Sequence, residues 1–167
     1  MKPLLITLLC SAIFLRANAQ ASINVFEEKS VENPNEVLFT TEILGFGEDF
    51  VLWHWLDFLQ AHGGKSAFVQ NEKGNFQMDT VHVEFPPMGN ETVNIKTQLT
   101  PNATETGVNF AIGISNGQGK FLNSSDLTKT EYRDLKNWML AFNRYLRTTE
   151  KEEIFNAKQL IHQQTTI

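Results

Sequence analysis

Two neighbouring stretches of the chain alternate apolar with polar or small residues. Residues 93–99 and residues 108–114 both place a Val, Ile, Leu, Phe or Thr at every second position. A period of two is that of a strand with one buried face. Residues 76–85 change phase near Asp79 and Thr80, which predicts a β-bulge or a strand apolar on both faces. The chain must therefore contain a sheet, and the short turns between its strands favour antiparallel pairing.

A helix is predicted before this sheet region. A strand over residues 37–44 ends at a glycine, and Glu48 and Asp49 then place two acids at the positive end of a helix dipole. Gly63 and Gly64 follow the apolar repeat as C-cap residues. The pattern predicts a helix over residues 48–62.

The last third of the chain is also helical by pattern. Residues 128–131 have the form of a capping box, and one apolar stripe follows as far as Leu146. The stripe loses phase near Thr148 and Thr149, and the capping pattern repeats at residues 149–152. We therefore predict two C-terminal helices with a break between them, one continuous helix being the alternative.

These elements predict an α+β fold. The expected architecture is a two-layer sandwich, in which an antiparallel sheet of about five or six strands is covered on one face by the N-terminal helix and the C-terminal helices, in the order β-α-β(4-5)-α-α. Residues 37–165 are predicted to form a single domain. Residues 20–36 are polar and are predicted to be a flexible lead-in.

Residues 1–19 have the form of a secretory signal. Lys2 precedes an apolar run over residues 4–15, and Ala17-Asn18-Ala19 is a small-x-small cleavage site. Lys2, Arg16 and the single cysteine, Cys10, would leave with it, so 12 basic side chains would face 19 acidic ones in the mature chain. A mature chain without cysteine has no thiol nucleophile and no Cys-ligated zinc. We predict a secreted or periplasmic protein with no transmembrane segment in its mature chain, a membrane anchor being the alternative.

Charge and motifs bear on the class of function. Residues 20–119 carry a net charge of −9 and residues 120–167 one of +2, with acids interspersed among the bases. This distribution argues against a nucleic-acid partner. The common nucleotide-binding and metalloprotease patterns are absent, and the serine-elbow spelling around Ser115 sits between strands rather than before a helix. His82 and Glu84 share a strand face, but two ligands do not define a metal site. No cofactor and no metal are predicted.

One face of the predicted helix over residues 48–62 carries a candidate binding patch. Phe50 and Trp53 are large aromatics on the side opposite the apolar arc, and His54 and Asp57 lie three residues apart on the same side. The two polar residues are close enough for a carboxylate to orient an imidazole. The interpretation we favour is that the C-terminal helix buries Phe50 and Trp53 and leaves His54 and Asp57 as a surface pair.

The second candidate surface is the face of the sheet opposite the helices. Its polar side chains are Asn94, Lys96, Gln98 and Asn109, which suit water or a partner. A ligand could bind on this face or in the groove between sheet and helices.

Short motifs resemble those of a known group of proteins. The matching residues are Trp55, Gly63-Gly64-Lys65 and the segment 119–124, within a similarity that covers about residues 37–155. The layout is similar to a family of uncharacterised exported proteins of Gram-negative bacteria, which has Ser where this chain has Asn123. The resemblance implies a TBP-like α+β fold and no catalytic residue.

The resulting hypothesis is an exported, non-enzymatic binding or structural protein of the periplasm or cell envelope. Its partner would be a protein or a small-molecule ligand, and a homodimer is possible. The alternative is a hydrolase with an unrecognised His/carboxylate site, for which His54 and Asp57 are the first residues to test.

Overall fold

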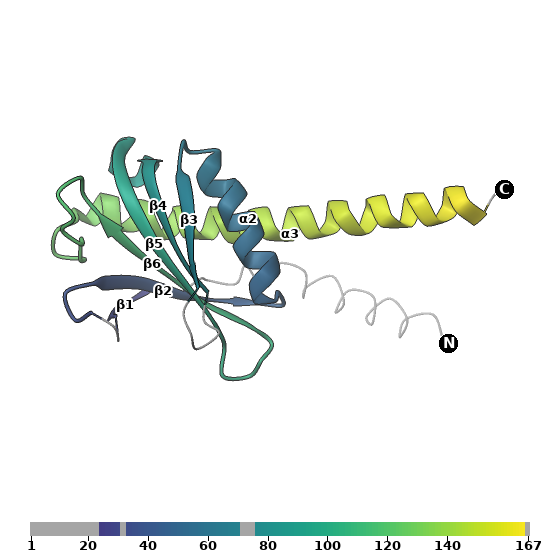
Figure 1. Ribbon diagram of the computed structural model, residues 1–167, viewed down its shortest axis with the longest axis horizontal. Coiled ribbons are helices and arrows are strands. Elements are labelled where there is room, and N and C mark those ends of the chain that lie inside the picture. Colours follow the sequence, from purple (N-terminus) through teal and green to yellow (C-terminus); the bar gives the residue numbers. More distant parts are fainter. Residues whose placement is uncertain (1–23, 31–32, 71–75, 166–167) are drawn as a thin grey trace, which may run out of the picture.

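The structure is a computed structural model that describes residues 24–30, 33–70 and 76–165. Six strands form one antiparallel sheet in the order β1-β2-β6-β5-β4-β3 (Figure 1). The strands are β1 (Phe26–Lys29), β2 (Val37–Leu44), β3 (Lys65–Gln70), β4 (Phe76–Phe85), β5 (Glu91–Pro101) and β6 (Gly107–Ser115). The helices are α2 (Glu48–Gln60), the short 3-10 helix η1 (Pro86–Met88) and α3 (Lys129–Thr165). The predicted α+β class with an antiparallel sheet is confirmed.

Strand β5 buries alternate residues, as its period of two predicted. In β5 the residues Val93, Ile95, Thr97 and Leu99 are buried, whereas the side chains between them are only partly covered. The paired strand β6 presents Phe110, Ile112 and Ile114 to the same face, and the small residues between them are buried on the other face. This alternation is consistent with helices that cover one face of the sheet.

Strand β4 contains the irregularity that its sequence indicated. Its register against β5 shifts between Thr80 and Val83. His82 lies inside the shift with a φ of 61°, in the left-handed region. The extra residue returns Val83 and Phe85 to the buried face, so the bulge resolves the change of apolar phase in the sequence.

An aromatic core joins α2, the sheet and the first half of α3. Trp55 is fully buried at its centre, with ring centroids 4.8 Å from Phe110, 4.7 Å from Phe142 and 5.3 Å from Trp138. Its indole Nε1 donates a 2.8 Å hydrogen bond to Thr97 Oγ1. The hydrogen bond satisfies the polar atom of each buried side chain and fixes α2 over β5.

Strand β1 corrects the prediction for residues 20–36. Residues 26–29 pair in antiparallel fashion with residues 37–40 of β2, so this part of the expected flexible lead-in belongs to the sheet. All four residues of β1 are exposed, and an edge strand of this kind carries no alternation to reveal it. The predicted signal, residues 1–19, lies outside the described residues.

Helix α3 corrects the predicted break at Thr148 and Thr149. It is one continuous helix of 37 residues. Thr148 Oγ1 donates to Arg144 O at 3.1 Å and Thr149 Oγ1 donates to Tyr145 O at 3.0 Å, so both hydroxyls are satisfied within the helix. The loss of apolar phase marks the point where the helix leaves the sheet, not where it ends. The capping box at its start is confirmed, because Thr128 N donates to Glu131 Oε2 and Glu131 N donates to Thr128 Oγ1.

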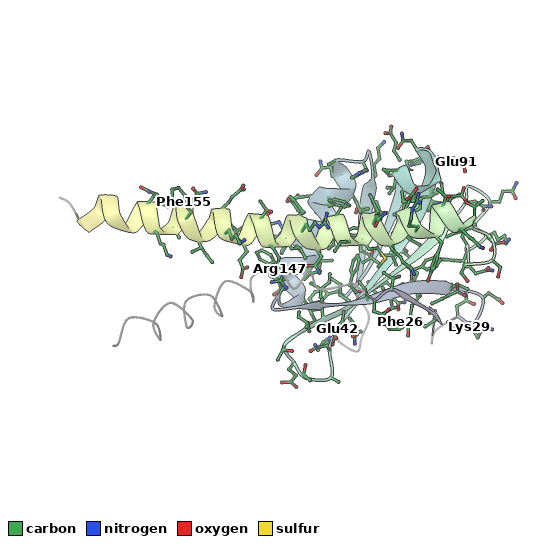
Figure 2. All side chains as sticks on the ribbon, turned by 180° about the vertical axis from the view of Figure 1, so that it is seen from behind. Phe26, Lys29, Glu42, Glu91, Arg147 and Phe155 are labelled. Atoms are coloured by element: carbon green, nitrogen blue, oxygen red, sulfur yellow. The ribbon has the colours of Figure 1, made fainter. Side chains whose placement is uncertain are left out.

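The C-terminal half of α3 projects beyond the sheet (Figures 1 and 2). We call residues 129–146 the packed half and residues 147–165 the α3 arm. Residues 151–160 are all exposed, and among them Ile154, Phe155 and Leu160 are 47%, 60% and 61% exposed. Within the described part of the chain, no helix has both the length and the apolar character needed to cross a membrane.

Candidate functional site

The predicted patch on α2 is an aromatic stack that faces the base of the arm. Phe50 stacks on Phe46 at a centroid distance of 5.0 Å, and its ring meets His54 at 4.3 Å. On the other side the His54 ring lies 5.9 Å from Tyr145 of α3. The structure therefore brings Phe50 and His54 together, and it places both beside α3.

Two residues of the same helix do not join this stack. Trp53 is 59% exposed, so the interpretation that α3 buries it is wrong. Asp57 is also exposed. Phe50 is half-buried and packs against the core, so the same interpretation holds in part for this residue.

The His54 imidazole differs most from the prediction. Its side chain is only 14% exposed, so it is not half of a surface pair with Asp57. Its Nε2 lies 3.6 Å from Glu153 Oε1 on the α3 arm, and its Nδ1 is buried without a hydrogen-bond partner. The carboxylate beside the imidazole is thus Glu153, nearly a hundred positions later in the sequence. Nothing local in the sequence could have identified this contact.

Arg147 holds the arm base to the end of β2. Its Nη2 donates a 3.0 Å hydrogen bond to Leu44 O, and its guanidinium carbon lies 5.1 Å from the Phe46 ring centroid. Both contacts are of the kind that an arginine makes with a carbonyl and an aromatic face. Together with the His54–Glu153 contact, they fix the direction in which the arm leaves the domain.

On the sheet face opposite the helices, polar side chains pair with other groups of the protein. Lys96 Nζ lies 2.7 Å from Glu36 Oε2, and both side chains are nearly covered, at 13% and 12% exposed. Because the pair is largely covered from solvent, removing one partner would leave the other charge poorly solvated and without its counter-ion. Lys96 is therefore committed to Glu36, a residue that was assigned to the flexible lead-in.

The other three residues predicted on this face are partly covered. Asn109 Nδ2 lies 3.4 Å from Pro101 O as a donor, and Asn94 Oδ1 accepts a 3.4 Å hydrogen bond from His82 N. Gln98 is half-buried. The structure places Asn94, Lys96, Gln98 and Asn109 on one face, as predicted, but two of the polar groups are engaged with the backbone and one with a carboxylate.

The groove between sheet and helices is filled. Trp55, Phe110 and Phe142 are completely buried there, and each packs against the other two. Small-molecule sites are concave and keep an accessible volume. The space between the sheet and the helices, where a ligand groove was expected, is thus packed hydrophobic core at these three residues.

A cavity of about 480 Å³ lies at the end of the sheet, between the β2–α2 and β5–β6 loops. It is lined by Phe46, Glu48, Glu105, Thr106 and Val108, together with nearby glycines and Pro101. Glu48 Oε1 is buried without a partner. Burial, and then the neighbouring Asp49 carboxylate, raise the pKa of the Glu48 carboxyl. The sequence indicates for Glu48 only a place at the start of the helix.

The described residues contain no cluster of three or more His, Cys, Asp or Glu side chains that could hold a metal ion. His82, which could pair with Glu84 by sequence, stands in the β4 bulge. Because His82 lies in this bulge, the two-residue spacing between His82 and Glu84 does not by itself place both side chains on one face as it would in a regular strand.

Comparisons with known proteins give no match to a family model, to a curated protein or to a solved structure. The resemblance to exported proteins with a TBP-like fold accordingly stays a prediction. The geometry itself distinguishes two features: the covered imidazole of His54 and the exposed arm beside it.

Proposed function

We propose that the protein is an exported, non-enzymatic binding or structural protein of the periplasm or cell envelope, and that it holds a protein partner on the α3 arm. The observation that carries this proposal is the run of ten exposed residues over 151–160, which includes Ile154, Phe155 and Leu160. Exposed apolar side chains on a helix are the usual anchors of helix-mediated recognition. Trp53 adds an exposed aromatic on α2, whose next residue, His54, touches the arm.

The shape of this surface favours a protein over a small molecule. Ile154 and Leu160 are six residues apart, which is about 9 Å along a helix and about 120° around it, so a partner must contact more than one side of the arm. They stand on a projecting rod and not in a hollow, whereas small ligands bind in concave sites. A partner must therefore supply the surface that encloses these side chains.

Paired variants test the binding part of the proposal. Replacing Phe155 and Leu160 by Ser removes two anchors, and replacing Asn156 and Gln159 by Ser changes the same two turns without removing apolar area. We expect wild type and the Asn156/Gln159 control to migrate as one complex of defined size on native electrophoresis of the envelope fraction. The Phe155/Leu160 variant should migrate as free protein.

Reconstitution decides the result. The partner identified in the complex should bind the purified protein, with at least tenfold weaker affinity for the Phe155/Leu160 variant, which corresponds to about 1.4 kcal/mol. Equal affinity for both variants, or one migration pattern for all three proteins, would contradict the proposal.

Export is tested separately by intact mass. The protein recovered from the periplasm or the medium should begin at Gln20, after loss of residues 1–19. A protein that retains residue 1 and stays with the cytoplasmic fraction would exclude export while leaving the arm experiment valid.

A further inference from the structure

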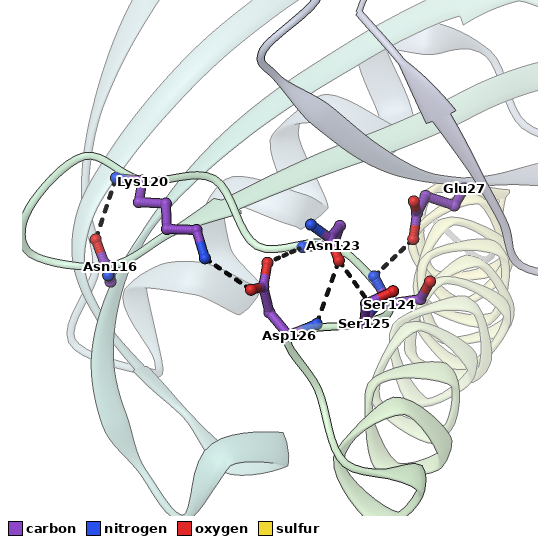
Figure 3. A network of polar contacts seen from close by, with 7 residues as sticks. All are labelled: Glu27, Asn116, Lys120, Asn123, Ser124, Ser125 and Asp126. Atoms are coloured by element: carbon purple, nitrogen blue, oxygen red, sulfur yellow. Dashed lines mark hydrogen bonds and ion pairs between the residues drawn. The ribbon is translucent and has the colours of Figure 1, made fainter.

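The loop between β6 and α3 adds a contact to the edge strand β1, which also pairs with β2. Ser124 N in this loop donates a 2.6 Å hydrogen bond to Glu27 Oε2 of β1 (Figure 3). Asp126 steadies the loop, because Lys120 Nζ lies 2.7 Å from its Oδ1 and Asn123 N donates to its Oδ2 at 3.1 Å. The integrity of this loop therefore bears on how β1 is held.

The first turn of the loop is built on the side chain of Asn116. Its Oδ1 accepts hydrogen bonds from two backbone N–H groups, those of Gln118 and Lys120, each at 3.1 Å (Figure 3 draws the second). The bond to Gln118 closes a ring that includes the backbone nitrogen of Gly117. The carboxamide oxygen of Asn116 is therefore fixed within this turn by two hydrogen bonds.

Gly117 leaves the nitrogen of the Asn116-Gly117 peptide bond without steric protection from a side chain. It is exposed, and a Cβ at this position would meet nothing within 4 Å. Within the described residues its N–H donates no hydrogen bond. Asn116-Gly117 is also the one Asn-Gly pair in the sequence. An asparagine followed by a residue without a side chain is the arrangement with the least steric protection of the backbone nitrogen.

We propose that Asn116 is a self-modifying site, at which Gly117 N attacks the Asn116 side chain and converts it to aspartate and isoaspartate. A bond forms between Gly117 N and Asn116 Cγ as the Gly117 nitrogen loses its proton to water. The bond from Cγ to Nδ2 breaks, and Nδ2 leaves as ammonia with a proton from solvent. Water then opens the cyclic imide at either carbonyl, giving Asp or isoAsp, and no oxidant or cofactor is needed.

The two N–H groups on Oδ1 act on this reaction directly. Attack on Cγ places negative charge on Oδ1, and Gln118 N and Lys120 N are already directed at that oxygen. Preorganised donors at the atom where charge develops lower the barrier, as in an oxyanion hole. The native turn should consequently promote the conversion and not protect against it.

The two products differ in their effect on the loop. Aspartate keeps the Oδ1 acceptor and preserves the turn. Isoaspartate inserts an extra methylene into the main chain between residues 116 and 117, which displaces the 3.1 Å bond from Asn116 N to Lys120 O and the 2.9 Å bond from Gly119 N to Asn116 O. Accumulation of isoaspartate should loosen the loop that holds β1.

Peptide mapping of the purified full chain, incubated in neutral buffer, tests the proposal. We expect Asn116 to convert before every other asparagine, with both products present. Gly117→Ala is the matched variant, because the space is open and no positive φ is required there, and it should lose most of the conversion while folding normally.

Two outcomes would overturn the proposal. One is conversion of Asn116 no faster than that of Asn156, which is exposed on the α3 arm but followed by alanine. The other is slower conversion in the folded chain than in the chain unfolded by urea, because that would mean that the turn protects the side chain.

Discussion

Residues 129–146 and residues 147–165 belong to the same helix, but only the first group lies against the sheet. In the packed half, Leu135, Phe142 and Leu146 are completely buried, whereas in the arm every residue from 151 to 160 is exposed. No acidic and basic residues stand four positions apart in the arm, and Arg147 and Lys151 place like charges at that spacing. Beyond the contacts of Arg147 and Glu153 at its base, residues 151–160 of the arm are exposed, and Arg147 and Glu150 are its one oppositely charged pair at helical spacing. The arm thus has little of the packing and few of the side-chain pairs that support an isolated helix.

The difference shows that helical backbone and helix stability have separate origins in this protein. Packing stabilises the first half, and continuity with that half supports the arm, since propagation of a helix is far easier than its nucleation. A partner on the arm would add the packing that the chain itself does not supply. Substitutions confined to one half of α3 separate the two contributions.

Two phenylalanines on α3 give the most direct contrast. Phe142→Ala should lower the free energy of unfolding by about 3–5 kcal/mol, because it opens a cavity beside Trp55. Phe155→Ala should change it by less than about 0.5 kcal/mol, because that ring is 60% exposed. Urea unfolding followed by tryptophan fluorescence measures both. Equal losses for the two variants would show that the arm is packed in solution.

Proline separates the backbone effect from the packing effect. Ala141 and Asn156 are both exposed, so substitution removes little apolar contact at either position. Ala141→Pro should cost about 3 kcal/mol by breaking the packed half. Asn156→Pro should reduce the helical circular dichroism signal and leave the urea midpoint unchanged. A lower midpoint for Asn156→Pro would mean that the arm contributes to domain stability.

The boundary between the halves should respond moderately. Arg147→Ala removes the hydrogen bond to Leu44 O and the contact with the Phe46 ring, for an expected loss of about 0.5–1 kcal/mol. Arg144→Ala, three residues earlier on the exposed side, is the control and should be neutral. Amide exchange near residue 147 should rise in the first variant alone.

The smallest effect is expected at the start of the packed half. Hydrogen bonds from Thr128, the backbone N–H first, hold the pKa of the Glu131 carboxyl below its ordinary value. This contribution to stability is complete above the unfolded pKa and is lost as the pH falls through the folded pKa. Glu131→Gln should therefore lower stability slightly at neutral pH and flatten the acid limb of the stability profile, because the part of the contribution that depends on the carboxylate charge is absent at every pH. An identical acid limb in both proteins would contradict the capping role.

The fold was predictable where the signal is local. The alternation of residues 93–99 and 108–114 located two strands, the phase change near Thr80 located the bulge, and Glu48 with the later glycines located α2. Strand β1 was missed because its four exposed residues carry no period, and its pairing depends on β2. The break predicted at Thr148 was wrong because loss of apolar phase was taken for a helix end.

The candidate site was less predictable because its contacts join distant segments. Phe50 and His54 share a helix face by sequence, and the structure confirms that they touch. The partners Glu153, 99 positions after His54, and Glu36, 60 positions before Lys96, follow only from the folded chain. Trp53 was expected to be covered by α3, but α3 passes His54 and leaves Trp53 exposed.

Because α3 is one continuous helix, the distance from the domain to the tip of the arm is fixed. Nineteen helical residues from 147 to 165 correspond to about 28 Å, with no proline or glycine to act as a hinge. A load applied near the tip would be transmitted as a turning moment to the base, where Arg147 and Glu153 connect the helix to β2 and α2. For a partner attached to it, the arm would act as a spacer, and deleting seven residues, close to two turns, would move that partner toward the sheet by about 10 Å with a rotation of only about 20°.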